Sequence, residues 1–368
     1  MRRPVAPLWL ARPSRFATVS QPVARAVLAL LVVLVMLTWL ALAPTPVESS
    51  VGGGADHGTD MGLYAAIVEG VRHGGDYYTV AADAMRAGNY PLRPFVTMRL
   101  PTLAVVAASL PSIALSGMLY LLALATMIAW YRRLRPALSR AALAIAMILL
   151  LGGMVAFLQT GLVLFHEIWA GLFVALSLAL RRPGRWLESV AFGLAAVLVR
   201  ETAVPYLALM AVFAFAEGSR REAMAWLASL VVIAVVLTLH AHAVALAVRP
   251  LDPQSPGWAG LLGIGFVVRA IISATALSLF PLAFAAPLAG IALFGWTAWH
   301  DPLALRLSAL LAGYTILLGL FGRLDTFYWV LLVAPLWLVG LVFAVDGVRD
   351  LVRAAHDGRR ITVRRIIR

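Results

Sequence analysis

The stretch ARAVLALLVVLVMLTWLALA, residues 24–43, carries one charged residue in twenty positions. A run of this length matches the ~20 residues that an α-helix needs to cross the roughly 30 Å hydrocarbon core of a bilayer. Because it follows a basic N-terminus and ends in the triplet Ala41-Leu42-Ala43, a cleaved signal peptide is the alternative. The run is too long for a signal-peptide core, and Pro44 directly after the triplet disfavours cleavage. We therefore interpret residues 24–43 as a retained membrane helix.

Outward from this helix, the chain is a series of similar segments. Seven further runs of comparable length are predicted to span the membrane: 112–130, 139–159, 163–180, 223–246, 277–298, 307–322 and 328–346. Two shorter segments, 188–199 and 203–216, flank Arg200-Glu201 and predict a shallow hairpin with its polar tip below the membrane surface. Hydrophobic residues make up 62% of the chain and charged residues only 13%, about half the charged fraction of a typical soluble protein. The sequence therefore predicts an all-α, polytopic integral membrane protein with about ten transmembrane helices.

Arginine supplies all 30 basic residues, and its distribution sets the predicted orientation. With the N-terminus in the cytoplasm, 22 of the 30 arginines fall in inner segments, whereas ten of the 17 acidic residues fall in outer ones. The net charge of +13 then follows from topology, and no nucleic-acid partner is expected. We expect a multi-pass protein of a bacterial inner (plasma) membrane with both termini cytoplasmic. Its parts are a basic N-terminus (1–23), a transmembrane domain (24–346) and a basic C-terminal tail (347–368).

The predicted outer loop 44–111 contains the densest polar stretch of the chain, TDMGLYAAIVEGVRHGGDYY (59–78). A helix is expected to begin near Asp60, which falls in the first turn, where the helix dipole favours an anion. The Gly-Gly pair ends this helix, and a second is expected over 76–86. Both are predicted to lie in the membrane interface, as is the segment 257–276 after a later outer loop.

Ionisable residues from five separate segments gather on the predicted outer side. Such groups at membrane depth are costly, and they usually face a polar cavity or a partner. The candidates to bind a substrate are Asp76, Arg99, His166, Glu167, Arg200, Glu201, Arg269, Arg323 and Asp325. This arrangement predicts an outward-facing site at the water–lipid boundary. Aromatic residues near helix ends are expected to anchor the membrane interface: Trp258, Tyr328 and Trp329.

The first outer loop also carries a recognisable pattern, D-x-x-x-Y-x-x-x-V followed by G-D-Y-Y. Its residues are Asp60, Tyr64, Val68, Gly75, Asp76, Tyr77 and Tyr78. This pattern resembles the first extracytoplasmic loop of GT-C glycosyltransferases, which take sugars from polyprenyl-phosphate carriers. Dolichyl-phosphate-mannose and aminoarabinose transferases belong to that family. Later segments are also similar to it: RLPTLA (99–104), HEIWAGLFVALSLALRR (166–182) and VRETAVPYL (199–207).

The resemblance covers roughly residues 20–220 and implies a GT-C-like fold and an inverting transferase. The enzyme would move a hexose or pentose from a polyprenyl-phosphate donor to a lipid, glycan or protein acceptor, with Asp60 as the candidate base and Asp76 as the alternative. A leaving lipid phosphate needs fixed cations, for which the candidates are Arg99, Arg200, Arg269 and Arg323. Candidates to orient or contact the substrates are Tyr64, Tyr77, His166 and Glu167. The resemblance implies no certain cofactor, and a divalent cation held by Asp60 with Asp76 or Glu167 is left open.

Other interpretations compete with this one. A polytopic transporter or lipid flippase would also place polar groups inside a helix bundle, although at the midplane and in repeated halves. A non-catalytic assembly protein would leave Asp60 and the arginines without a shared cavity. Individual residues also have structural alternatives: Asp76 as a helix cap, and Arg200-Glu201 or Arg323 with Asp325 as ion pairs.

Overall fold

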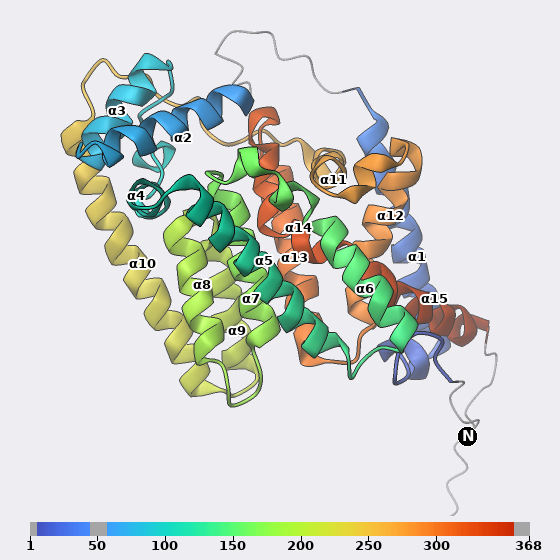
Figure 1. Ribbon diagram of the computed structural model, residues 1–368. Helices are drawn as coiled ribbons and strands as arrows, with labels where there is room; N and C mark the ends of the chain where they lie inside the picture. Colours follow the sequence, from blue (N-terminus) through green and yellow to red (C-terminus); the bar gives the residue numbers. More distant parts are fainter. Residues whose placement is uncertain (1–5, 45–56, 357–368) are drawn as a thin grey trace, which may run out of the picture.

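The computed structural model describes residues 6–44 and 57–356, and these parts of the chain form helices and no β-strand (Figure 1). Four helical segments are long and apolar enough to cross a membrane: α1 (Gln21–Thr38) with the following η2 (Trp39–Leu42), α5 (Ser112–Leu134), α10 (Arg220–Ala247) and α13 (Pro302–Phe321). A fifth candidate is the bent pair Leu324–Leu332 and Ala334–His356, whose halves meet at 62°. The all-α class is therefore confirmed, together with several candidate membrane spans.

The prediction of about ten spans is not confirmed. Several of the apolar runs are helices of only 13 to 15 residues: α6 (Arg140–Gly153), α7 (His166–Leu180), α8 (Leu187–Val199), α9 (Val204–Ala216) and α12 (Leu282–Gly295). At ~1.5 Å per residue, a helix of about 15 residues is roughly 22 Å long, short of the ~30 Å hydrocarbon core. A run of apolar residues contains no signal for a short break in the helix. Two short helices in sequence can therefore look like one membrane-length span.

The last predicted span, 328–346, is one such joined segment. In the structure it contains the end of η9 (Leu324–Leu332), the short α14 (Ala334–Trp337) and the start of α15 (Gly340–His356). Helix α15 therefore crosses the predicted boundary at residue 346. The predicted interfacial segment 257–276 also differs from the structure, where the helix α11 covers only Gly263–Ala274.

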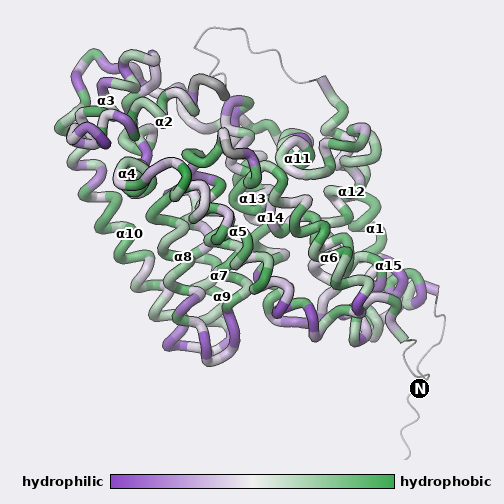
Figure 2. The backbone as a smooth tube through the Cα atoms, in the orientation of Figure 1, coloured by the Kyte–Doolittle hydropathy of each residue, from purple (hydrophilic) through white to green (hydrophobic). Residues whose placement is uncertain are grey.

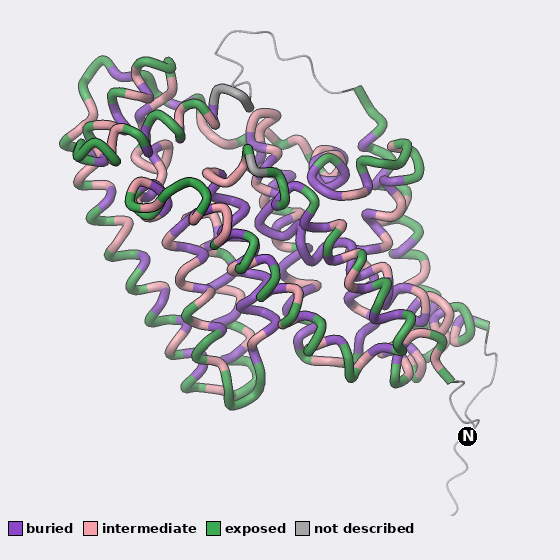
Figure 3. Tube along the Cα trace, in the orientation of Figure 1, coloured by how far each residue is buried: buried purple, intermediate pink, exposed green. Residues whose placement is uncertain are grey.

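Apolar residues cover the sides of the helices, whereas hydrophilic residues gather at the two ends (Figure 2). Helix α10 leaves much of its side exposed; Val231 and Leu239 are each 64% exposed. Helix α7 is the opposite, because almost every residue from His166 to Ala179 is buried (Figure 3). An apolar helix that is exposed along its side suits contact with lipid, and one that is apolar on all sides belongs in the core. The protein thus has an inner helix surrounded by lipid-compatible ones.

The close packing of α7 depends on a glycine. An alanine Cβ at Gly171 would overlap the backbone carbonyl oxygen of Leu331. The absence of a side chain therefore lets η9 approach the α7 backbone. Since η9 also carries Tyr328 and Trp329, this contact helps to place both aromatic residues beside the N-terminal end of α7.

Two helices of the first predicted outer loop lie across one end of the bundle, α2 (His57–Arg72) and α3 (Tyr77–Ala87), with α4 (Thr102–Ser109) below them (Figure 1). Gly74, whose φ of 88° suits a residue without a Cβ, separates α2 from α3. Both helices were predicted, and Asp60 lies in the first turn of α2 as expected. We call this end of the molecule the cavity end. The opposite end carries the loops 181–186 and 217–219 and is called the arginine end.

The N-terminal segment is attached to α15 at the arginine end. The buried carboxylate of Asp346 accepts hydrogen bonds from the backbone N–H groups of Leu8, Trp9 and Leu10 at 2.8–2.9 Å. The predicted N-terminal part and the last helix therefore form one structural unit. Residues 357–368, the rest of the predicted tail, lie outside the described part of the chain.

Candidate functional site

A cavity of about 1200 Å³ opens at the cavity end. Its wall comes from eight parts of the chain: α2, α3, the segment 88–99, α4, the start of α7, the break 200–202 between α8 and α9, the segment 253–260, and residues 321–329. The volume exceeds that of a typical small-ligand pocket, ~300–1000 Å³. Segments far apart in the sequence thus meet around one space, as the distribution of ionisable residues predicted.

Most of the residues singled out from the sequence line this cavity. Nine of the twelve do so: Asp60, Tyr64, Tyr77, Arg99, His166, Arg200, Glu201, Arg323 and Asp325. Of the remaining three, Glu167 lies directly behind the wall as a partner of Arg200. Their shared location makes this cavity the candidate site, although it assigns no role to any one residue.

Asp76 and Arg269 were predicted to bind substrate and do not line the cavity. The Asp76 carboxylate instead caps α3 by accepting the backbone N–H of Thr79 at 3.0 Å. Arg269 donates from Nε to the backbone oxygen of Ala41 at 3.1 Å and from Nη2 to that of Ala43, so it satisfies carbonyl groups at the end of η2. Both residues have a structural use that competes with ligand binding.

Arg200 is fully buried between two carboxylates. Its Nε donates to Glu167 Oε1 at 2.6 Å, and its Nη1 donates to Glu201. Its guanidinium also lies over the Trp329 ring, 5.8 Å from the ring centroid. The extended backbone at Arg200, with φ −144° and ψ 108°, separates α8 from the next helical turn. We call Glu167, Arg200 and Glu201 the cavity-end network.

Arg99 is held less tightly than Arg200. Its closest polar side-chain contacts are Tyr64 Oη at 3.4 Å, Tyr328 Oη at 3.5 Å and Glu201 Oε1 at 4.0 Å. Its backbone is fixed, because Tyr77 Oη donates to the Arg99 carbonyl oxygen at 2.6 Å. The backbone of Arg99 is therefore fixed, whereas its guanidinium can still donate a further strong hydrogen bond.

Asp60 lies in the cavity wall and is 7% exposed. Its Oδ1 accepts a hydrogen bond from Tyr90 Oη at 2.9 Å. Burial and this bond to Asp60 raise the pKa of Tyr90 above its ordinary value, so the phenol stays protonated and continues to donate. The carboxylate is thus oriented by a neutral donor.

Comparisons with protein-family models, curated proteins and solved structures found no match to this chain. Function is therefore inferred from the geometry and from the sequence pattern.

A second layer of contacts supports the Arg99 segment, and no sequence pattern predicts it. His240 of α10 bonds the backbone oxygen of Met98 through Nε2 at 3.1 Å, and its Nδ1 lies 3.2 Å from Tyr78 Oη. Tyr77 thus holds the Arg99 backbone directly. Tyr78 contacts His240, which in turn bonds the backbone of Met98, the residue before Arg99. Tyr78 belongs to the G-D-Y-Y pattern, but its histidine partner is 162 positions away, so the sequence alone does not pair them.

Three aromatic residues expected at the membrane interface line the cavity instead: Trp258, Tyr328 and Trp329. Tyr328 is 7% exposed, and its ring lies edge-on to Phe165 with centroids 4.9 Å apart. An aromatic residue near a helix end suits either a bilayer surface or a cavity wall. Their position in the fold decides between the two.

The segment after α10 closes one side of the cavity and is attached to α3. Asp252 accepts two hydrogen bonds from Arg86, both at 2.8 Å, and one from the backbone N–H of Arg249 at 2.7 Å. These bonds lower the pKa of Asp252 from its ordinary value of 3.8 to about 2. We call this contact the Arg86–Asp252 clamp.

The donor set does not favour a metal site in the part of the chain that the structure describes. There, no group of three or more His, Asp or Glu side chains is placed to hold a metal ion. The residues considered as partners of Asp60 are otherwise engaged, since Asp76 caps α3 and Glu167 pairs with Arg200. No step of the chemistry below is routed through a cation.

Proposed function

We propose that the protein is an inverting glycosyltransferase of GT-C type. It would move a hexose or pentose from a polyprenyl-phosphate donor to an acceptor at the outer face of a bacterial inner membrane. The observation that carries this proposal is the convergence of Asp60, Arg99 and an apolar wall on one cavity at a single end of a bundle of apolar helices. Further support comes from the residues available to act as the base, to stabilise the leaving phosphate and to contact the lipid.

Asp60 suits the role of the base. An acceptor hydroxyl must lose its proton as it attacks the anomeric carbon, and a carboxylate at the cavity wall can accept it. The hydrogen bond that Tyr90 donates to Oδ1 fixes the orientation of the carboxylate in the cavity wall. Attack by the acceptor on the face opposite the leaving phosphate inverts the anomeric centre.

Arg99 suits the leaving lipid phosphate better than Arg200 does. Negative charge that develops on a leaving oxygen is stabilised by a positioned cation. Arg200 already contacts two carboxylates, whereas the side-chain contacts of Arg99 are 3.4 Å or longer. Among the candidate arginines, we therefore assign Arg99 to the leaving phosphate.

The lipid part of the donor has an apolar surface to follow. Apolar side chains of α2 and α4 line the cavity beside the polar residues: Leu63, Ile67, Val68, Leu103 and Ala104. On α4, Val105 and Val106 are exposed and available to a bilayer. A polyprenyl chain beside α4 would keep its phosphate near Arg99, which precedes this helix.

A transporter or flippase is the alternative from a different class. Transport needs a path between the two ends of the bundle, and the residues that line this cavity come from one end. Near the opposite ends of α7 and α9, the interior holds a paired network of Arg181, Glu217, Glu222 and Arg306. This asymmetry favours an enzyme acting at one membrane surface.

The test uses the full-length protein in lipid nanodiscs. Wild type is incubated with radiolabelled polyprenyl-phosphate mannose, glucose, galactose or arabinose and with a crude membrane fraction as acceptor. We expect transfer from at least one donor, and Asp60→Asn should lower the rate by about 10²–10⁴-fold. Asp76→Asn is the matched control, because this carboxylate belongs to the same loop and does not line the cavity. Absence of transfer and of released lipid phosphate with all four donors refutes the proposal, and lipid scrambling in liposomes would then support the flippase.

A further inference from the structure

The cavity wall around Arg200 combines unpaired hydrogen-bond donors with unpaired acceptors. Within residues 6–44 and 57–356, the buried polar atoms that lack a partner include Arg200 Nη2, Glu201 Oε2, Thr202 Oγ1, Trp329 Nε1 and both ring nitrogens of His166. All five residues line the cavity. His166 is only 4% exposed and Arg200 is fully buried.

These unpaired groups point to a ligand. Leaving a buried polar group without a hydrogen bond costs about 1–3 kcal/mol. Native proteins tolerate few such groups, and a cluster of them needs an explanation. The cluster borders the cavity on the side of the break between α8 and α9, so a molecule in the cavity is placed to complete the bonds.

The kinds of atoms in the cluster restrict what that molecule is. Arg200 and Trp329 only donate hydrogen bonds, the Glu201 carboxylate only accepts them, and Thr202 and His166 do both. A phosphate offers acceptors alone, so it would satisfy Arg200 and leave Glu201 Oε2 facing a second anion. Hydroxyl groups donate and accept, and several of them on one ring match a mixed set.

The local charge supports the same conclusion. Glu167 and Glu201 both contact Arg200, so two carboxylates surround this one guanidinium. A further anion would meet repulsion that grows in a buried, weakly screened environment. A neutral ligand avoids this repulsion and still uses the polar atoms.

We infer that the wall formed by His166, Arg200, Glu201, Thr202 and Trp329 is a subsite for a neutral, polyhydroxylated ring. The choice of ring rests on the proposed function, in which it is the sugar that is transferred, with its phosphate towards Arg99. Arg200 then recognises hydroxyl groups and not the lipid phosphate, which is a different assignment from the one that its charge alone suggests.

The test measures binding of uncharged ligands to the full-length protein in nanodiscs. Methyl glycosides of mannose, glucose, galactose and arabinose are titrated calorimetrically. We expect at least one to bind, and Thr202→Val and Trp329→Phe should each weaken it about three- to tenfold, as for the loss of one hydrogen bond. Inorganic phosphate should not displace the glycoside.

Matched controls come from unpaired buried groups elsewhere in the protein. Ser308 Oγ and Trp226 Nε1 also lack partners among the described residues, but neither residue lines the cavity. Ser308→Ala and Trp226→Phe should therefore leave glycoside affinity unchanged. The inference is overturned if no glycoside binds wild type, if phosphate displaces it, or if the controls weaken binding as much as the cavity variants.

The outcomes separate this inference from the proposed function. Glycoside binding that depends on Thr202 and Trp329, without sugar transfer, would support the subsite and refute the transferase. Transfer from a polyprenyl-phosphate sugar with a KM unchanged in Thr202→Val and Trp329→Phe would support the transferase and refute the subsite.

Discussion

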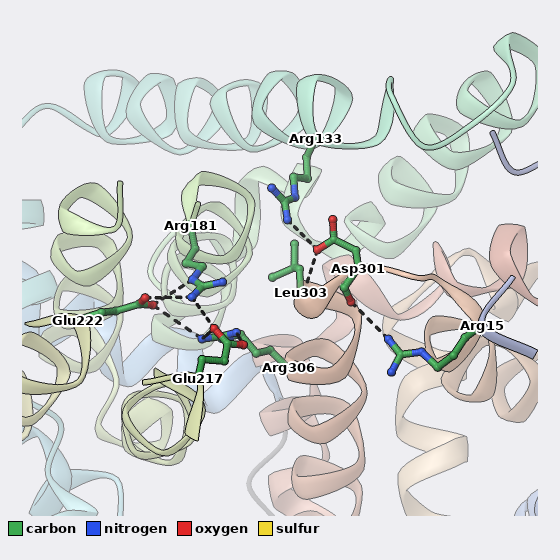
Figure 4. A network of polar contacts seen from close by, with 8 residues as sticks. All are labelled: Arg15, Arg133, Arg181, Glu217, Glu222, Asp301, Leu303 and Arg306. Atoms are coloured by element: carbon green, nitrogen blue, oxygen red, sulfur yellow. Dashed lines mark hydrogen bonds and ion pairs between the residues drawn. The ribbon is translucent and has the colours of Figure 1, made fainter. Parts of the chain in front are cut away.

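Arginine–carboxylate networks with buried arginines lie at both ends of α7, and they are built from the same residue types. The cavity-end network joins Glu167 at the start of the helix to Arg200 and Glu201. In the second network, Arg181, directly after the helix, pairs with Glu217 in the loop after α9 and with Glu222 of α10, and Glu217 also pairs with Arg306 of α13 (Figure 4). We call this second group the closed network.

The two networks differ in how completely their carboxylate oxygens are paired, although Arg306 Nε of the closed network also lacks a partner among the described residues. In the closed network, Glu222 accepts from Arg181 Nε at 3.0 Å and Nη2 at 2.9 Å, and both oxygens of Glu217 also accept from arginine. In the cavity-end network, Glu167 Oε2 and Glu201 Oε2 have no partner within the described residues. A satisfied polar network stabilises and specifies a core, whereas an incompletely satisfied one beside a cavity is suited to binding. Residue type alone therefore does not distinguish a structural network from a functional one.

Removing an arginine from the closed network should give the largest change in stability. Arg306→Met would leave Glu217 without one of its two arginine partners and weaken the charge balance at buried Glu222. We expect the free energy of unfolding to fall by about 3–5 kcal/mol, as for other broken buried ion pairs. Reversible unfolding of the detergent-solubilised protein measures it.

Arg185→Met is the control at the same end, because this side chain is 79% exposed and lies 3.9 Å from Glu188. Exposed pairs contribute little, about 0–1 kcal/mol. Equal losses of stability in Arg306→Met and Arg185→Met would show that the closed network is not a stabilising element.

Exchanging arginine for lysine at each end sharpens the comparison. Lysine keeps the charge but cannot reach two carboxylates with a planar fork. We expect Arg200→Lys to lower the rate of sugar transfer about 10–100-fold, because it disturbs Glu201 and the cavity wall. Its free energy of unfolding should fall by about 1.5–3 kcal/mol, as for the loss of hydrogen bonds to charged groups. Arg181→Lys should lower stability by a similar amount and leave transfer by the folded protein unchanged. Equal effects of the two variants on transfer would contradict the functional difference between the networks.

The smallest effect should be seen at the Arg86–Asp252 clamp, which attaches the cavity-lining segment 253–260 to α3. The pKa of Asp252 is lowered from 3.8 to about 2 by its bonds from Arg86 and Arg249. A lowered pKa means that the contribution to stability is complete above pH 3.8 and is lost as the pH falls through about 2. We expect peptic cleavage near Leu251, which is 97% exposed, to accelerate over this pH range.

Asp252→Asn should be cleaved at the same relative rate across that range, because it lacks the titrating carboxylate. Asp83→Asn is the control, since Asp83 also contacts Arg86 but is 59% exposed. Wild-type pH dependence in Asp252→Asn would assign the loosening to another acidic group.

Local features of the candidate site were readable from the sequence. Asp60 lies in the first turn of α2, and the helix ends at the Gly-Gly pair, because these features depend on backbone groups a few positions away. The polar break at Arg200-Glu201 also separates two helices as expected, since ionisable residues interrupt an apolar run. The all-α class followed from the composition and from the length of the apolar runs.

Tertiary structure alone decided which polar residues share the cavity. Arg269 and Arg99 look alike in the sequence, yet one binds the backbone oxygens of Ala41 and Ala43 and the other faces Tyr64 and Glu201. A hydrogen bond requires its two atoms to lie within about 3.5 Å, and segments distant in the sequence reach that distance only after the helices have packed. Composition, periodicity and helix-breaking residues thus determined the class of the protein and its local elements, whereas the choice of partners, and with it the site, was determined by packing.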